Sequence, residues 1–165
     1  MHSSPMNTQH RTLGAFSEMA RVEFNQDQAC LDLTRAAAAL CDAPIALVSL
    51  GVGEHMWFHT RIGLDADTIP KRASFCECAM QSCDDVLVVE DASVDPRFAD
   101  NDLVTGSPGI RFYVGAPLIM STGEVLGNLC VLDTKPKTLA PPQLEQLMFL
   151  ARQVADALER VKRPV

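Results

Sequence analysis

Two short polar turns between apolar segments constrain the fold of this chain most strongly. Only two residues separate the apolar segment 45–52 from the strand-like segment 55–62, and only three separate 110–120 from 124–134. Turns this short join neighbouring antiparallel strands, whereas parallel strands need a crossover of a dozen or more residues. The sequence therefore predicts two antiparallel hairpins and excludes a regular alternation of parallel strands and helices.

Helical segments flank the hairpins. The Ala-rich segment 26–41 carries an apolar stripe and ends before Pro44, which cannot donate a backbone hydrogen bond, so it predicts a helix. Segment 141–161 predicts a second helix with two prolines in its first turn. Its apolar residues recur every three or four positions: Leu144, Leu147, Ala151, Val154, Leu158 and Val161. This spacing fits either a seam between two copies of the chain or a helix that lies on a sheet, so both alternatives stay open.

The middle of the chain predicts shorter elements. Segment 86–92 predicts a third strand, and Ser74 with Glu77 has the spacing of a capping box for a short helix over 75–83. Segment 93–109 is rich in Asp, Asn, Gly and Pro and predicts a long loop with one helical turn. Together these elements predict an α+β fold in which helices are layered on an antiparallel sheet.

The length of 165 residues suits one domain. We expect the polar residues 1–10 to be disordered, residues 11–161 to form the single domain, and residues 162–165 to be a C-terminal tail.

Charge and composition restrict the partners. A net charge of −7 and an isoelectric point near 5.0 argue against binding to nucleic acids or anionic membranes, because both require clustered Lys and Arg. Most of the negative charge lies in 84–102, which holds seven acids and one base. The chain begins without the apolar core of a signal peptide and has no run long enough to span a bilayer, so we expect a cytoplasmic protein whose six cysteines are thiols.

Seven segments resemble one known family by their order and spacing: APIALVSL (43–50), WF (57–58), GL (63–64), SFC (74–76), VVEDASVDPRFADNDLVTG (88–106), IRFYVGAPL (110–118) and LGNLCVLDTKP (126–136). Over about residues 11–160 the chain resembles a GAF domain of the kind found beside bacterial histidine kinases and diguanylate cyclases. The resemblance implies a PAS-like antiparallel sheet of five or six strands. Terminal helices would cover one face, and short helices and loops would close a ligand cavity on the other.

The resemblance also implies partners. It predicts an unknown small-molecule ligand, a homodimer through residues 141–161, and a kinase or cyclase as a separate output protein. We interpret the chain as a sensory domain that binds a small molecule and passes the change to its terminal helices. A dimerisation scaffold with no ligand is an alternative.

Aromatic and polar residues predict where the cavity lies, because small-molecule sites are mostly apolar with a few polar groups. Arg111 and Tyr113 are two residues apart on a predicted strand and share a face. The same aromatic residues, Phe112 included, would otherwise fill the core. The candidate ligand-binding residues are Trp57, Phe58, Phe75, Cys76, Cys78, Phe98, Arg111, Tyr113 and Cys130.

Three cysteines, Cys76, Cys78 and Cys83, lie close together in the segment SFCECAMQSC. They are redox candidates because the first turn of a helix stabilises a thiolate; buried apolar side chains or metal ligands are the alternatives. The resembled family includes free methionine sulfoxide reductases. In such an enzyme Cys76 or Cys78 would attack, and Cys83 or Cys130 would resolve the intermediate through a disulfide. The family often has His in place of Cys78, so a role carried by that His does not transfer.

Other polar residues predict no catalytic centre. His55 and His59 lie four apart on a strand, without a carboxylate or cysteine at a supporting spacing, so we expect them at the surface and predict no metal site. Arg97 is expected to pair with Asp91 or Asp95. No nucleophile elbow, phosphate-binding loop or zinc motif is present, so the sequence predicts neither a resident cofactor nor an enzyme.

Overall fold

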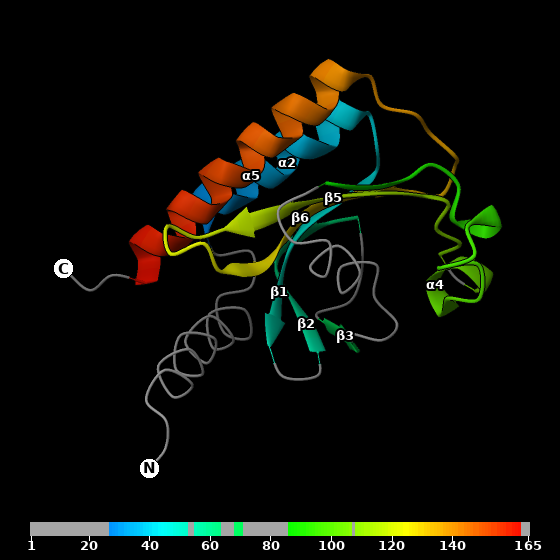
Figure 1. The fold of residues 1–165 in the computed structure, drawn as a ribbon, viewed down its shortest axis with the longest axis horizontal. Helices are drawn as coiled ribbons and strands as arrows, with labels where there is room; N and C mark the ends of the chain where they lie inside the picture. Colours follow the sequence, from blue (N-terminus) through cyan, green and yellow to red (C-terminus); the bar gives the residue numbers. More distant parts are fainter. Residues whose placement is uncertain (1–26, 53–54, 64–67, 71–85, 107, 163–165) are drawn as a thin grey trace, which may run out of the picture.

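The fold is built on one six-stranded sheet (Figure 1), seen in a computed structural model that describes residues 27–52, 55–63, 68–70, 86–106 and 108–162. The strand order is β3-β2-β1-β6-β5-β4, and every neighbouring pair is antiparallel. The strands are β1 (Ile45–Val52), β2 (His55–Ile62), β3 (Thr68–Pro70), β4 (Leu87–Val89), β5 (Phe112–Ile119) and β6 (Val125–Asp133). Both predicted hairpins are therefore confirmed, as is the α+β class with an antiparallel sheet of five or six strands.

Two long helices lie side by side on one face of the sheet (Figure 1). They are α2 (Gln28–Cys41) and α5 (Pro141–Lys162); two short helical elements, η2 (Ala92–Val94) and α4 (Asp102–Thr105), follow β4. Helix α2 begins where the Asp27 side chain accepts the backbone N–H of Cys30, and it ends at Asp42, whose φ of 52° is left-handed. Within the described residues, none of the helices combines the length and apolarity needed to cross a membrane.

The apolar stripe of α5 faces the chain's own core. Leu147, Ala151, Val154 and Leu158 are at most 2% exposed and join a cluster with α2 and the sheet. Of the two alternatives for this stripe, a helix that lies on a sheet is the one observed. The outer face of α5 carries other apolar side chains, with Phe149 55% exposed.

The opposite face of the sheet carries a second apolar cluster, to which β1, β2, β4, β5 and β6 contribute with the segment 92–110. Phe58, Phe98 and Tyr113 belong to it, whereas Phe112 lies in the helix-side cluster. Of the two alternatives for Phe112, core filling is therefore the one observed, because neighbouring residues of a strand point to opposite faces.

The central strands β1 and β6 approach closely at Gly127, which pairs with Leu50. A Cβ atom on Gly127 would overlap the carbonyl oxygen of Ser49. Glycine is therefore needed here for the two backbones to come together.

The short helix predicted over 75–83 lies outside the described residues. The predicted strand at 86–92 is shorter, ending at Val89, because Asp91 accepts the Ser93 N–H and Oγ–H and so starts η2.

Candidate functional site

Three polar side chains lie together in the apolar face that turns away from α2 and α5. The Tyr113 hydroxyl lies 3.2 Å from the Cys130 sulfur, and the Ser49 hydroxyl lies 3.8 Å from that same sulfur. Each of the three residues is fully buried, and they come from the adjacent strands β5, β6 and β1. Ser49 Oγ also donates to the backbone carbonyl of Asn128 at 3.5 Å. We call Ser49, Tyr113 and Cys130 the polar trio.

Gly115 makes room for the polar trio. Tyr113 lies two residues before Gly115 on the same strand, and a Cβ atom on Gly115 would collide with the Tyr113 ring and hydroxyl. Cys130 is the partner of Gly115 on β6, so the tyrosine reaches its sulfur by lying across the bare backbone. The trio thus depends on the absence of a side chain at Gly115.

Apolar residues surround the trio: Leu47, Phe58, Phe98, Ile110 and Leu132. The structure therefore brings together four predicted ligand-binding residues, Phe58, Phe98, Tyr113 and Cys130, in one cluster. A few polar groups set in apolar and aromatic surroundings are typical of a small-molecule site.

Arg111 does not join the trio. Its Nη1 donates to the carbonyl oxygens of Val104 and Ile110, both at 3.0 Å, and so ties helix α4 to the start of β5. These contacts give Arg111 a bracing role, and its expected contact with a ligand stays a prediction.

Arg97 pairs with Asp95, which was one of its two expected partners; the other was Asp91. Its Nε and Nη2 donate to the two carboxylate oxygens at 3.0 and 2.8 Å. This two-pronged hydrogen bond from Arg97 lowers the pKa of Asp95.

Five predicted residues cannot be placed by their side chains. Phe75, Cys76, Cys78 and Cys83 lie outside the described residues, and Trp57 is described by its backbone only. The redox interpretation of the cysteine cluster therefore stays a prediction.

A second group of polar residues lies between α2 and β2, where the sequence predicted none. The side chain of His59 is fully buried, and its Nε2 lies 3.0 Å from Asp27 Oδ2. The expectation that His59 lies at the surface is wrong. The partner Asp27 is 32 positions earlier in the chain, so spacing along β2 could not reveal it.

A β-bulge explains the orientation of His59. Val48 pairs with Thr60 but the next residue, Ser49, pairs with Phe58, so His59 is an extra residue in β2. Phe58 therefore joins the trio side of the sheet while Thr60 contacts α2.

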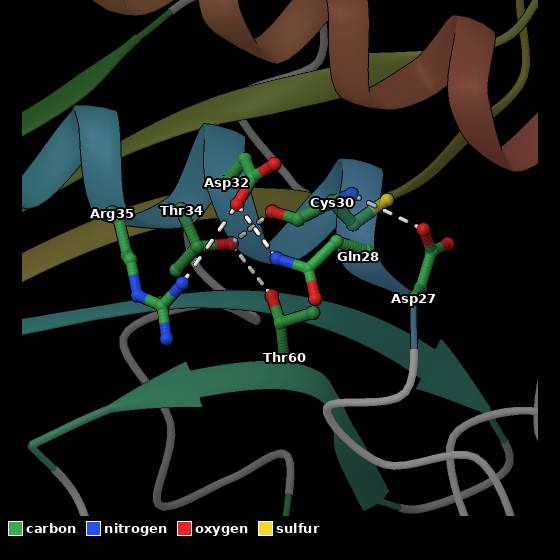
Figure 2. Close-up of polar contacts among 7 residues, drawn as sticks. All are labelled: Asp27, Gln28, Cys30, Asp32, Thr34, Arg35 and Thr60. Carbon is green, nitrogen blue, oxygen red and sulfur yellow. Dashed lines mark hydrogen bonds and ion pairs between the residues drawn. The ribbon is translucent and has the colours of Figure 1, made fainter.

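Figure 2 shows the continuation of these contacts along α2. The Thr34 hydroxyl donates to the Cys30 carbonyl at 2.6 Å and lies 2.7 Å from the Thr60 hydroxyl, which then acts as the donor. Cys30 comes from the first turn of α2, and its sulfur lies within 4.8 Å of the ligand atoms of Asp27 and His59. We call Asp27, Cys30, Thr34, His59 and Thr60 the α2–β2 polar seam.

The environment changes the pKa values of two groups in this helix start. The hydrogen bond from His59 is the main cause that lowers the pKa of Asp27 from 3.8 to about 2. Burial raises the pKa of the Cys30 thiol. The Cys30 thiol is therefore protonated near neutral pH in the metal-free protein.

The lowered pKa of Asp27 predicts a pH-dependent contribution to stability. A depressed carboxyl pKa stabilises the fold above the unfolded value, and this stabilisation is lost as the pH falls from about 4 to about 2. In metal-free buffer we expect Asp27→Asn to lower the free energy of unfolding by about 1–2 kcal/mol at pH 7, because Asn keeps the helix cap but not the charge.

Urea titrations from pH 7 to pH 2 measure this difference, which should shrink toward zero at the acid end. Asp32→Asn is the control, since Asp32 lies on the same helix with 63% of its side chain exposed. A difference between Asp27→Asn and wild type that does not change with pH would contradict the assigned pKa.

Comparison with known proteins identifies the family. The GAF domain family matches residues 25–158. The chain is 39% identical over 155 residues to a Pseudomonas aeruginosa protein named cyclic di-GMP phosphodiesterase PA2567, covering 93% of this chain but only 26% of that protein. The chain thus spans about a quarter of the length of this relative.

Solved structures share the fold at low identity. The GAF domain of a phosphoenolpyruvate-protein phosphotransferase from Coxiella burnetii aligns with a TM-score of 0.69 and 16% identity, over 97% of both chains. A type II free methionine-R-sulfoxide reductase from Thermoplasma acidophilum aligns with a TM-score of 0.63 and 13% identity, over 81% of this chain and 95% of the other. The same fold therefore occurs in an enzyme as well as in GAF domains of larger proteins. The match over most of the sequence, together with the six-stranded sheet and its helix layer, shows that this chain belongs to the GAF domain family.

Proposed function

We propose that this chain is a sensory domain that binds a small molecule over the polar trio. The observation that carries the proposal is the trio itself: three buried polar side chains on three adjacent strands, surrounded by apolar residues. If this face served packing alone, apolar side chains would stabilise it at least as well, because a buried polar group costs free energy unless it is paired. The trio instead provides hydroxyl and thiol groups that can exchange their mutual contacts for a ligand.

The composition around the trio restricts the ligand. Phe58, Phe98 and Ile110 offer apolar contact, while the exposed acids of the neighbouring segment, such as Glu90 and Asp102, repel anions. We propose a neutral or cationic molecule with an apolar body and one or two hydrogen-bonding groups.

The sheet provides a physical route from the ligand to the helices. Strands β1, β5 and β6 carry the trio on one face and hold the apolar cluster of α2 and α5 on the other. Binding shifts the helices only if the ligand has different affinities for two helix arrangements. Because close-packed layers do not deform freely, a displacement of these strands would move α2 and α5 with them.

The output is proposed from the relative. A protein named as a cyclic di-GMP phosphodiesterase contains a region similar to nearly all of this chain. We propose that the domain regulates a cytoplasmic enzyme of nucleotide signalling, either in one polypeptide with it or as a separate kinase, cyclase or phosphodiesterase. The domain itself would act by binding rather than by catalysis, since the Cys130 thiol is buried against Tyr113 and Ser49.

Self-association is proposed through the outer face of α5. The inner stripe of residues 141–161 is used by the core, so a homodimer would bring together the exposed Met148 and Phe149 instead. Pairing of these side chains from two copies would bury the apolar surface that a single copy leaves in water.

The proposed site is tested by ligand screening of the full chain. Native mass spectrometry of freshly purified protein and thermal-shift measurements with a metabolite library should identify a bound molecule. We expect Tyr113→Phe to weaken its binding about 2- to 12-fold, as for one lost hydrogen bond. Gly115→Ala should weaken binding further, because the tyrosine must leave its place over the strand.

Arg35→Ala, at an exposed position of α2, is the matched control and should bind like wild type. If no molecule copurifies with or stabilises the protein, the sensory proposal fails in favour of a scaffold. Reduction of free methionine sulfoxide that is lost in Cys76→Ser plus Cys78→Ser would instead show that the domain is an enzyme.

A further inference from the structure

We propose that Asp27, Cys30 and His59 form a binding site for a soft divalent metal ion of the zinc type. The carboxylate, thiol and imidazole atoms all lie within 4.8 Å of one another, and one pair, His59 Nε2 and Asp27 Oδ2, is 3.0 Å apart. Sulfur, nitrogen and oxygen ligands of this kind are those that zinc binds in proteins. The site lies across the sheet from the polar trio and is independent of the ligand proposed there.

The fold fixes each of the three donors by a different structural element. Asp27 is the N-cap of α2, and its Oδ1 accepts the Cys30 N–H at 3.1 Å. Cys30 follows on the first turn of the same helix. His59 is turned toward α2 by the bulge in β2. Helix capping and strand geometry already hold these donors near one another. Metal binding therefore costs little side-chain entropy.

The imidazole is held where a metal ion could bind it. His59 is fully buried, and its Nε2 lies 3.0 Å from Asp27 Oδ2, so a metal bound to both atoms would replace this hydrogen bond. The ring proton would then lie on Nδ1, which has no hydrogen-bond partner within the described part of the chain.

The charges balance when the metal binds. In the metal-free protein Asp27 contributes a negative charge and Cys30 is a neutral thiol. Binding of M²⁺ forms a metal–sulfur bond and releases the thiol proton to solvent, so a doubly charged ion meets one carboxylate and one thiolate. The resulting neutral site suits a place where two of the three side chains are fully buried.

The distances require only small adjustments. Metal–ligand bonds of 2.0–2.3 Å in a tetrahedron put the ligand atoms roughly 3.3–3.8 Å apart. The Asp27 and His59 atoms, 3.0 Å apart, must separate slightly, and the Cys30 sulfur, within 4.8 Å of both, must approach by at most about 1 Å. Side-chain rotation of Asp27 and Cys30 can supply these movements. Three protein ligands leave the fourth position to water, as in zinc sites that are open on one side.

A polar seam that served only to hold α2 on β2 does not need the thiol. The Asp27–His59 hydrogen bond and the Thr34–Thr60 contact already join the two elements. The Cys30 thiol is the third potential ligand, and with Asp27 and His59 it completes a set that can bind a metal.

Cobalt and zinc titrations of the chelator-treated, reduced full chain test the proposal. Co²⁺ should produce a thiolate-to-cobalt charge-transfer band, and Zn²⁺ should abolish it at one equivalent for this site. Zinc at about a hundredfold excess over Kd should raise Tm by roughly 5–10 °C. Metal content after gel filtration gives the stoichiometry independently.

Matched variants assign the site. Cys30→Ser should lose the band and one equivalent of metal, and Asp27→Asn, which keeps the helix cap, should weaken binding by more than about tenfold. Cys41→Ser is the control: Cys41 is also buried on α2, with its pKa raised by burial to about 11, but among the described residues it belongs to no group of three metal-ligating side chains. Circular dichroism of each metal-free variant checks that it is folded.

A charge-transfer band that persists in Cys30→Ser would place the metal elsewhere and overturn the proposal. So would the absence of any band, or an equal rise in Tm for wild type and Cys30→Ser.

Discussion

Replacing Leu147 and Leu158 together with glutamate is expected to unfold the domain rather than to release a folded monomer. Both leucines are fully buried between α5, α2 and the sheet. An unpaired charge in such a place costs about 4–5 kcal/mol or more, and two of them approach the whole stability of an ordinary domain, about 5–15 kcal/mol. Far-ultraviolet circular dichroism and thermal melts should show loss of the cooperative transition.

Phe149→Glu provides the matched control on the same helix. Phe149 is 55% exposed, so its replacement should change the free energy of unfolding by no more than about 0.5 kcal/mol. Light scattering of this variant also tests the proposed pairing, since a dimer through the outer face of α5 should become a folded monomer. A folded, cooperative Leu147→Glu plus Leu158→Glu variant would show that the stripe does not lie in the core.

Gly127→Ala is expected to destabilise the domain by about 3 kcal/mol or more. The added methyl group would overlap the carbonyl oxygen of Ser49, which is backbone and cannot rotate away like a side chain. Strands β1 and β6 would have to separate at the Leu50–Gly127 pair, in the middle of the sheet. Urea denaturation monitored by circular dichroism measures the loss.

Gly106→Ala is the comparison for Gly127→Ala. Gly106 follows α4 with a φ of −114°, and an added Cβ meets only the Asp102 carbonyl at 3.2 Å. Its replacement should change stability by less than about 1 kcal/mol. Equal effects of the two substitutions would mean that the strands adjust to the methyl group.

The elements that the sequence predicted well are those that local chemistry decides. Pro44 and the apolar stripe define where α2 ends and which side it buries, and the observed helix stops at Cys41. The hairpins follow from turns of two and three residues, which leave the chain no other connection. Tyr113 and Cys130 were both predicted ligand-binding residues, but their contact depends on the strand register of β5 and β6, which single-sequence patterns do not specify.

What the sequence could not predict depends on distant partners. His59 was expected at the surface because its neighbours in sequence offer no ligand, yet the fold brings Asp27 and Cys30 to it from the start of α2. Alternation along β2 also failed at this residue, because the bulge was not apparent from composition. The contacts of Arg111 could not be predicted for a similar reason: its carbonyl partners, Val104 in α4 and Ile110, are brought to it by tertiary packing.

The bulge at His59 has a consequence for comparing this chain with its relatives. A single extra residue reverses the inside–outside phase of β2, so that residues before and after His59 follow two different alternation frames. An alignment that treats β2 as an uninterrupted strand will assign every residue on one side of the bulge to the wrong face. Relatives that lack the extra residue should therefore be aligned with a gap at position 59, and they would present no side chain there to α2.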